Sequence, residues 1–262
     1  LLPTVPSVYF SVFFTGLLLI LIIRLPYQRF ASILKWLCIS LFVYFIVPFL
    51  TKNNVWQIVK HTIVPTIKFD KDFVSIVVAI LGTTISPYLF FWQATMEVEE
   101  KKNSGRKIMV NKRMINEMKL DVDLGMLFSN LVMYFIILTT ATVLFQNGIK
   151  KIDTVEQAAK ALQPLAGNFA YYLFAIGIIG TGLLTIPVLS GALSYIYSEA
   201  FGWKGSLNKK FHQAKSFYTV IIISLLFGLA INYLGVSPID ALIYMAILYG
   251  ITAPVLIGIV LH

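Results

Sequence analysis

The chain has 262 residues, of which 58% are hydrophobic and 13% are charged, so it is far more apolar than an ordinary soluble domain. This composition indicates an integral membrane protein, and the basic residues behind the net charge of +9 flank apolar runs instead of forming a separate nucleic-acid-binding domain. Its one cysteine, Cys38, excludes both a disulfide framework and a cysteine metal cluster.

The first apolar run does not resemble a signal peptide, because it lacks a basic segment before it and a small-residue cleavage site after it. The sequence also begins with Leu1 and ends in an apolar run at Leu261-His262. We therefore expect it to start inside a longer protein and to stop before that protein ends.

Seven apolar stretches come close to the roughly 20 residues that a helix needs to cross a bilayer. In chain order they are 7–23, 31–50, 73–96, 124–145, 169–197, 217–234 and 239–261. They leave no room for a soluble domain, so residues 1–262 are predicted to form a single transmembrane domain in contact with the lipid bilayer.

The orientation of these segments follows from the Lys and Arg residues in the connections, since cytoplasmic loops are enriched in them. Thirteen lie in 24–29, 101–119 and 204–215, against seven in 52–71 and 150–160. The segment 101–120 is therefore predicted to be a basic cytoplasmic loop.

The third segment, 73–96, is interrupted at Ser86-Pro87 and is predicted to be a broken helix. Proline has no N–H and clashes with the carbonyl four residues earlier, so the Thr83 carbonyl loses its intrahelical partner. Near the middle of a bilayer such a carbonyl is tolerated where something polar uses it, and a cation is the natural candidate. The alternative is a plain kink, since many proline kinks in membrane helices bind nothing.

Several oxygen-bearing side chains surround this break. They are Thr83, Thr84, Ser86, Tyr88 and Gln93. Because no soft ligand is present there, the pattern favours a cation that prefers oxygen.

Two other features leave alternatives open. The acidic group Glu97, Glu99 and Glu100 follows the broken helix and is either a cytoplasmic exit ring for cations or a solvated helix end paired with Lys101 and Lys102. The stretch 154–166 is amphipathic and is either an interfacial helix on the outer membrane surface or a loop helix packed on protein.

The sequence LGTTISPYLFFWQA at the break resembles the broken sixth transmembrane helix of the natural-resistance-associated macrophage protein (NRAMP) metal transporters. The family pattern there runs glycine, small, threonine, aliphatic, methionine, proline, histidine. The sequence AAKALQPLAGNFAYYLFAIGIIGTGL resembles the stretch that leads into and forms their eighth helix. The resemblance covers essentially the whole chain, as helices four to ten of eleven or twelve.

The resemblance implies a metal site at the break. Thr83 stands where the family binds metal through a backbone carbonyl, and Ser86 stands where it has a metal-binding methionine. Tyr88 and Gln93 replace two histidines, and Ala246 replaces a glutamine that approaches the ion. The family's other ligands, an aspartate and an asparagine on a broken first helix, would precede Leu1.

These differences favour a hard cation. Methionine sulfur prefers transition metals, and a hydroxyl in its place removes that preference. An all-oxygen site suits Mg²⁺, and the loss of a histidine at position 88 argues against strong proton coupling. The pattern is similar to the NRAMP-related magnesium transporters, in which serine-proline-tyrosine and the trailing EVEE are usual.

The sequence thus predicts an all-α integral membrane protein with a LeuT-like inverted-repeat transporter fold, a broken transmembrane helix and an incomplete first repeat. We expect a divalent metal cation transporter in the bacterial cytoplasmic (inner) membrane, not an enzyme, that imports Mg²⁺ or Mn²⁺ as substrate and needs no cofactor. The alternatives are a proton-coupled Mn²⁺/Fe²⁺ symporter, with protons as a further partner, an amino-acid transporter of the same fold, and a non-transporting membrane subunit.

Overall fold

The computed structural model describes residues 7–25, 55–103, 112–145, 154–231 and 233–262, together with 32–33, 36, 38, 45–46, 148–149 and 152. All regular structure in these residues is helical. The helices are α1 (Ser7–Arg24), α4 (Val55–Ile63), α5 (Lys71–Thr84), α6 (Pro87–Asn103), α7 (Lys112–Thr139), α8 (Val155–Ala200), α9 (Lys215–Ile231) and α10 (Pro238–Leu261). A π-helical turn at Thr140–Leu144 follows α7, and a 3-10 turn at Phe211–Gln213 precedes α9.

Four apolar helical stretches in the described residues are long enough to cross a membrane, namely Lys71–Glu99, Lys112–Thr142, Phe174–Ala200 and Pro238–Leu261. The first of these contains the interruption between α5 and α6. Two shorter apolar helices, Val8–Arg24 and Lys215–Ile231, accompany them. The predicted span 31–50 lies mostly outside the described residues.

Two predicted connections include more helix than the hydropathy pattern indicated. The segment 101–120 overlaps the end of α6 at Asn103 and the start of α7 at Lys112. The segment 154–166 belongs to the same helix, α8, as the span that follows it. Most side chains in that first part of α8 lie outside the described residues, so its place at the membrane surface stays a prediction.

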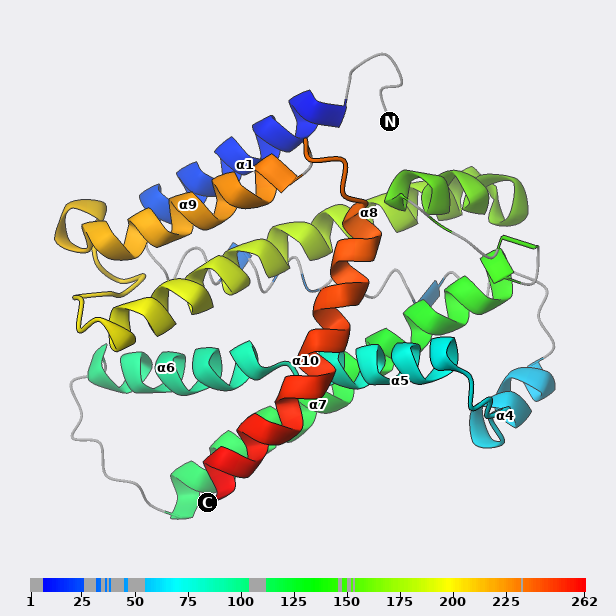
Figure 1. Ribbon diagram of the computed structural model, residues 1–262, viewed down its shortest axis with the longest axis horizontal. Helices are drawn as coiled ribbons and strands as arrows, with labels where there is room; N and C mark the ends of the chain where they lie inside the picture. The colour runs from blue at the N-terminus through cyan, green and yellow to red at the C-terminus, as the bar shows by residue number, and fades with distance from the viewer. Residues whose placement is uncertain are drawn as a thin grey trace.

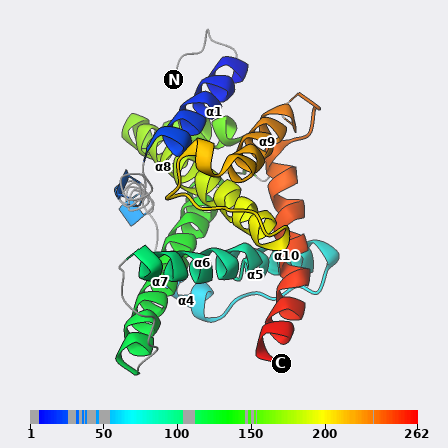
Figure 2. The same ribbon diagram turned by 90° about the vertical axis from the view of Figure 1, so that its left-hand side faces the viewer.

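The helices α1, α8 and α9 pack against one another, and α6 packs against α8 (Figure 1). The helices α5 and α6 follow one another nearly end to end, and α10 crosses them steeply at the level of the break (Figures 1 and 2). This crossing gives α10 its most extensive contact, which is with α5.

Small residues allow the crossing of α5 and α10 to be close. A Cβ atom added to Gly82 would meet the carbonyl oxygen of Ala246 and the backbone nitrogen of Gly250. A Cβ atom on Gly250 would in turn meet the carbonyl oxygen of Val78. The backbone that carries the break is therefore in direct contact with the backbone of α10.

A cluster of buried residues joins the ends of α1 and α8 to the start of α9. Its members are Ile22, Tyr195, Leu207, Ala214, Phe217, Tyr218, Ile221 and Leu225. The rings of Tyr195 and Phe217 meet edge to face at 4.9 Å between centroids. Trp92 and Met96 of α6 pack against this cluster, so the second half of the broken span is attached to it by side chains.

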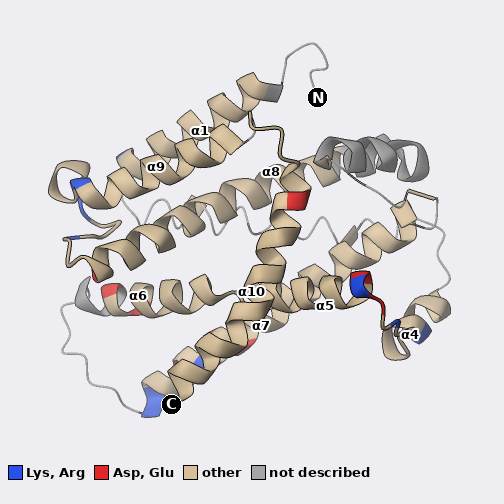
Figure 3. Ribbon diagram, in the orientation of Figure 1, with Lys and Arg blue, Asp and Glu red and all other residues tan. Residues whose placement is uncertain are grey.

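The charged residues lie mainly at helix ends and in the connections (Figure 3). The ends of α6 and α8 and the start of α9 lie on the same side of the molecule in Figure 1. The loop between α8 and α9 lies on this side, and the Lys and Arg bias assigns that loop to the cytoplasm.

Candidate metal site

The helix is interrupted for two residues at the predicted break. The backbone leaves the helical conformation at Ile85, where φ is −111° and ψ is 62°, and α6 begins at Pro87. Proline is favourable at the first position of a helix, because it needs no hydrogen-bond acceptor there. The same residue that ends the hydrogen-bond ladder of α5 therefore starts α6.

The Ser86 hydroxyl takes the place of the missing backbone donors. It lies 3.1 Å from the Gly82 carbonyl oxygen and 2.9 Å from the Thr83 carbonyl oxygen, and it donates to them. Ser86 is 4% exposed, so its contact with the Gly82 carbonyl is buried, whereas its contact with the carbonyl of Thr83, an exposed residue, is only partly buried. Each carbonyl has two lone pairs, so both oxygens keep acceptor capacity beyond the serine hydroxyl.

The threonine side chains before the break bond to the backbone of their own helix. The hydroxyls of Thr83 and Thr84 both donate to the Ile80 carbonyl, at 2.9 and 2.8 Å. The Thr84 hydroxyl also lies 3.5 Å from the Met133 sulfur of α7. The carbonyl of Thr83 is therefore better placed to act as a ligand than its side chain.

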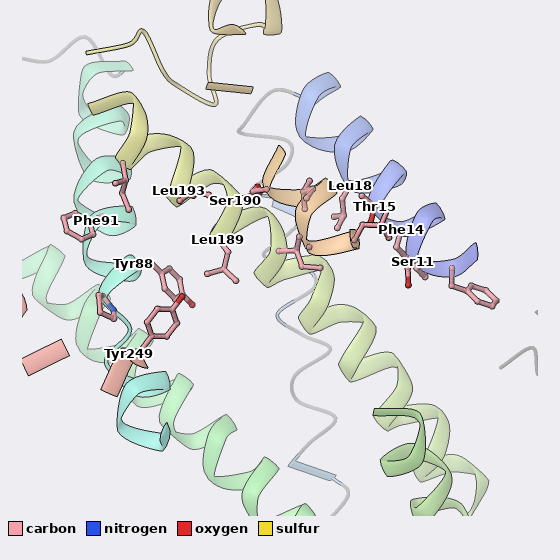
Figure 4. Close-up of a pocket in the computed structure, with 18 residues that line it drawn as sticks. Ser11, Phe14, Thr15, Leu18, Tyr88, Phe91, Leu189, Ser190, Leu193 and Tyr249 are labelled. Carbon is pink, nitrogen blue, oxygen red and sulfur yellow. The ribbon is translucent and has the colours of Figure 1, made fainter. Parts of the chain in front are cut away.

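A cavity of about 860 Å³ begins at the break and extends among five helices (Figure 4). It is lined by Phe10, Ser11, Phe14, Thr15 and Leu18 of α1, Pro87, Tyr88 and Phe91 of α6, Ile186, Leu189, Ser190, Leu193 and Ile196 of α8, Ser224, Leu225, Gly228 and Leu229 of α9, and Tyr249 of α10. The lining is mainly apolar, with hydroxyl groups from all five helices.

Tyr88 meets a tyrosine that sequence reasoning did not single out. Its ring lies 6.0 Å from that of Tyr249, and both side chains line the cavity (Figure 4). Ser190 lines it from α8. In the sequence, Ser190 and Tyr249 are marked only by a hydroxyl group in an apolar segment. That pattern does not predict which face of α8 or α10 turns toward α6.

The structure brings three of the four candidate residues together. Thr83, Ser86 and Tyr88 lie within two turns around the break, but only Tyr88 of these lines the cavity, and Thr83 is exposed. Gln93 is exposed further along α6 and does not line the cavity either. Ala246 is 7% exposed and lies against Gly82 through its carbonyl oxygen. The position that the resemblance gives to a glutamine therefore faces α5 at the break but offers no side-chain ligand.

The chemistry around the break is that of neutral oxygen. In the part of the chain that the structure describes, no group of three or more His, Cys, Asp or Glu residues could hold a metal ion. Carbonyl and hydroxyl oxygens suit hard cations such as Mg²⁺, Ca²⁺ and Mn²⁺. They supply no charge, so a divalent ion here also needs anionic ligands or retained water.

A helical membrane protein with a discontinuous span next to an internal cavity has the architecture of a secondary transporter. The sequence profile of the family described as natural resistance-associated macrophage protein-like (Nramp) matches residues 1–262. The chain therefore belongs to the Nramp family, whose members are LeuT-fold membrane transporters and not enzymes. The fold class predicted from the sequence is confirmed.

Curated relatives carry the name divalent metal cation transporter MntH. The protein of Caldanaerobacter subterraneus is 24% identical over 209 residues, which are 80% of this chain and 46% of the relative. That of Clostridium acetobutylicum is 26% identical over 206 residues, 79% of this chain and 44% of the relative. A third, from Yersinia enterocolitica, is 29% identical over 119 residues. The matched part is thus less than half the length of each of these relatives.

Proposed function

We propose that the protein containing this chain transports divalent metal cations, importing Mg²⁺ or Mn²⁺ across the bacterial cytoplasmic membrane by alternating access. The observation that carries the proposal is the buried Ser86 hydroxyl, which donates to the Gly82 and Thr83 carbonyls at a break in a membrane span. Family membership and the names of the relatives support it, although each of them is more than twice the length that this chain matches.

The break offers a cation a small set of oxygen ligands. The Thr83 carbonyl coordinates directly, and the Ser86 hydroxyl turns a lone pair toward the ion while its proton stays on a carbonyl. Mg²⁺ keeps several of its waters in protein sites, so Tyr88 and Tyr249 act through hydrogen bonds to those waters. Gln93, which is exposed and does not line the cavity, has no part in this set of ligands. The missing charge comes from residues outside this chain.

Selectivity depends in this proposal on Ser86. A thioether at this position favours Mn²⁺ and Fe²⁺, whereas a hydroxyl gives no advantage to a transition metal over Mg²⁺. A site without sulfur therefore does not exclude Mg²⁺ in favour of a transition metal. The competing proposal is proton-coupled uptake of Mn²⁺ or Fe²⁺, with the selectivity set elsewhere.

The test uses the full-length protein in liposomes, with Mg²⁺ and Mn²⁺ uptake recorded side by side and a pH dye inside. Saturable Mg²⁺ entry without acidification is expected. Replacement of Ser86 by Met should raise the ratio of Mn²⁺ to Mg²⁺ uptake by on the order of tenfold, the effect of about 1.4 kcal/mol of differential binding.

Ser224→Ala is the matched control for the hydroxyl. Ser224 lines the same cavity, but its hydroxyl donates to the Ile221 carbonyl of its own helix and lies on α9 away from the break. The ratio of Mn²⁺ to Mg²⁺ uptake should stay unchanged in this variant. Mn²⁺ entry with acidification and no Mg²⁺ flux in the unmodified protein would instead establish the proton-coupled alternative.

A further inference from the structure

A second cavity, of about 490 Å³, lies between the ends of α6 and α8 on the side assigned to the cytoplasm. It is lined by Phe91, Ala94, Thr95, Val98 and Glu99 of α6, Tyr195, Ser198 and Glu199 of α8, and Gly202, Trp203 and Gly205 of the loop that follows α8. Phe91 is the one lining residue that it shares with the cavity at the break.

The loop after α8 is held tightly over this cavity. Gly202 has a φ of 66°, the Trp203 N–H donates to the Ser198 carbonyl at 2.8 Å, and the Gly202 N–H donates to the Glu199 carbonyl at 3.4 Å. This is the Schellman arrangement that ends many helices at a glycine. Gly205 then passes so close to Ser198 that a Cβ atom on it would overlap the serine side chain. The cavity wall is therefore built from fixed backbone.

Two carboxylates from different helices line the cavity. Glu199 of α8 accepts a hydrogen bond from the Thr95 hydroxyl at 3.3 Å, and Glu99 of α6 accepts one from the Asn208 amide at 3.0 Å. Among the side chains that the structure describes, neither is paired with Lys or Arg. The predicted partners Lys101 and Lys102 have side chains outside the described residues. In the described part of the chain, both carboxylates are therefore held by neutral donors, the Thr95 hydroxyl and the Asn208 amide.

Ser198 provides an independent sign of a ligand. It lines the cavity and is 4% exposed, and its hydroxyl has no hydrogen-bond partner among the residues that the structure describes. Buried hydroxyls nearly always have a partner, because losing water without replacing it costs free energy. The hydroxyl packs against Gly205, and a bound ion, or a water molecule held by that ion, would supply the missing partner once the side chain turns toward the cavity.

We propose that Glu99, Glu199 and Ser198 bind a hydrated divalent cation of the Mg²⁺ class at the cytoplasmic end of the broken span. Two carboxylates and retained water are a usual environment for Mg²⁺, and the cavity has room for that water. Glu99 follows Pro87 by twelve positions in the helix, which is about 18 Å along α6. The site is therefore separate from the one at the break, and its binding does not depend on the proposed transport function.

Terbium luminescence on the full-length protein in detergent tests this site. Tb³⁺ is a hard cation that binds carboxylate and hydroxyl oxygen, and its emission is excited by a nearby indole. Trp203 lines the cavity and is the expected donor. We expect emission that Mg²⁺ displaces and that Trp203→Phe weakens.

The double variant E99Q/E199Q keeps side-chain size and removes both charges, so it should lower Tb³⁺ affinity at least tenfold, and S198A several-fold. The matched control is Glu97→Gln, which makes the same charge change on α6 at a residue that does not line the cavity. The Tb³⁺ affinity of this control should stay within twofold of that of the unmodified protein.

Unchanged affinity in E99Q/E199Q, or an equal loss in E97Q, would overturn the proposal. The elution volume of each variant on a sizing column shows that it has folded. Ser86→Met separates this site from the break. Its Tb³⁺ emission should match that of the unmodified protein even if its cation uptake changes.

Discussion

The helix before the break and the helix after it adjoin in sequence but contact the rest of the molecule differently. The first, α5, meets α10 backbone to backbone at Gly82 and Gly250, with no room for an added methyl group. Its hydroxyl groups near the break bond to its own backbone. Nothing polar from this helix lines either of the two cavities.

The second helix, α6, meets α8 through side chains. The Trp92 ring lies 6.0 Å from that of Tyr195 and covers Gly191. Cavities lie at both ends of α6, one beginning at Pro87 and Tyr88 and the other lined by Thr95 and Glu99. The polar groups that could face a cation after the break therefore belong to α6.

This difference has a mechanical consequence. A helix in backbone contact with its neighbour cannot slide along it without a steric clash, whereas a helix held by side chains can shift when those side chains change rotamer. Discontinuous helices in transporters let one half move relative to the other. The packing predicts that α5 and α10 behave as one rigid unit and that α6 is the half that adjusts.

The largest expected effect is that of Gly82→Ala. The new methyl group would meet the Ala246 carbonyl and the Gly250 backbone, which cannot turn aside as a side chain can. Overpacking usually costs about 1–3 kcal/mol, and we expect more than about 3 kcal/mol here. Thermal unfolding in detergent should show a large fall in Tm or no folded protein. A Tm equal to that of the unmodified protein would mean that α5 and α10 are not in this close contact.

Ser86→Ala should have the next largest effect. It removes the hydroxyl from the buried Gly82 carbonyl and the partly buried Thr83 carbonyl, and an unsatisfied buried polar group costs about 1–3 kcal/mol. Uptake per folded molecule separates the two roles of the residue. If Ser86 is also a ligand, Mg²⁺ uptake falls at least tenfold at equal folded protein. If the serine only caps a kink, Tm falls and uptake does not.

Gly191→Ala tests the side-chain contact of α6 with α8. Its new methyl group would come within 2.7 Å of the Trp92 ring, which is the end of a side chain that can shift. We expect a loss of about 1–2 kcal/mol, clearly smaller than that of Gly82→Ala. A change in Trp92 fluorescence should accompany it. An equal loss in both variants would show that α6 is held as rigidly as α5.

The break could be predicted from the sequence because its causes are local. Proline lacks a donor wherever it stands, and the apolar run around Pro87 is long enough to place it within a bilayer. The direction of the Ser86 hydroxyl could not be predicted in this way. It depends on the non-helical backbone at Ile85, which turns the serine toward the two carbonyls.

The contacts between helices could not be predicted from the sequence for a different reason. Glu97 and Glu99 look equivalent in the sequence, but only Glu99 lines the cavity, because the face of α6 that meets α8 is set by packing. Tyr249 likewise depends on how α10 crosses α6. The extra helix in 101–120 has a simpler cause, since Lys, Arg, Glu and Met favour helix whether or not a membrane surrounds them.

The smallest expected effect is that of Gly228→Ala. This variant is the reference for the losses of stability expected in Gly82→Ala and Gly191→Ala. Gly228 lies inside α9 and lines the cavity at the break, and an added Cβ atom has no neighbour within 4 Å. Alanine then gains its helix propensity without a clash, so Tm should rise slightly, by the equivalent of about 0.5–1 kcal/mol. A fall in Tm would mean that this position is crowded in solution, and that the losses at Gly82 and Gly191 do not distinguish backbone from side-chain packing.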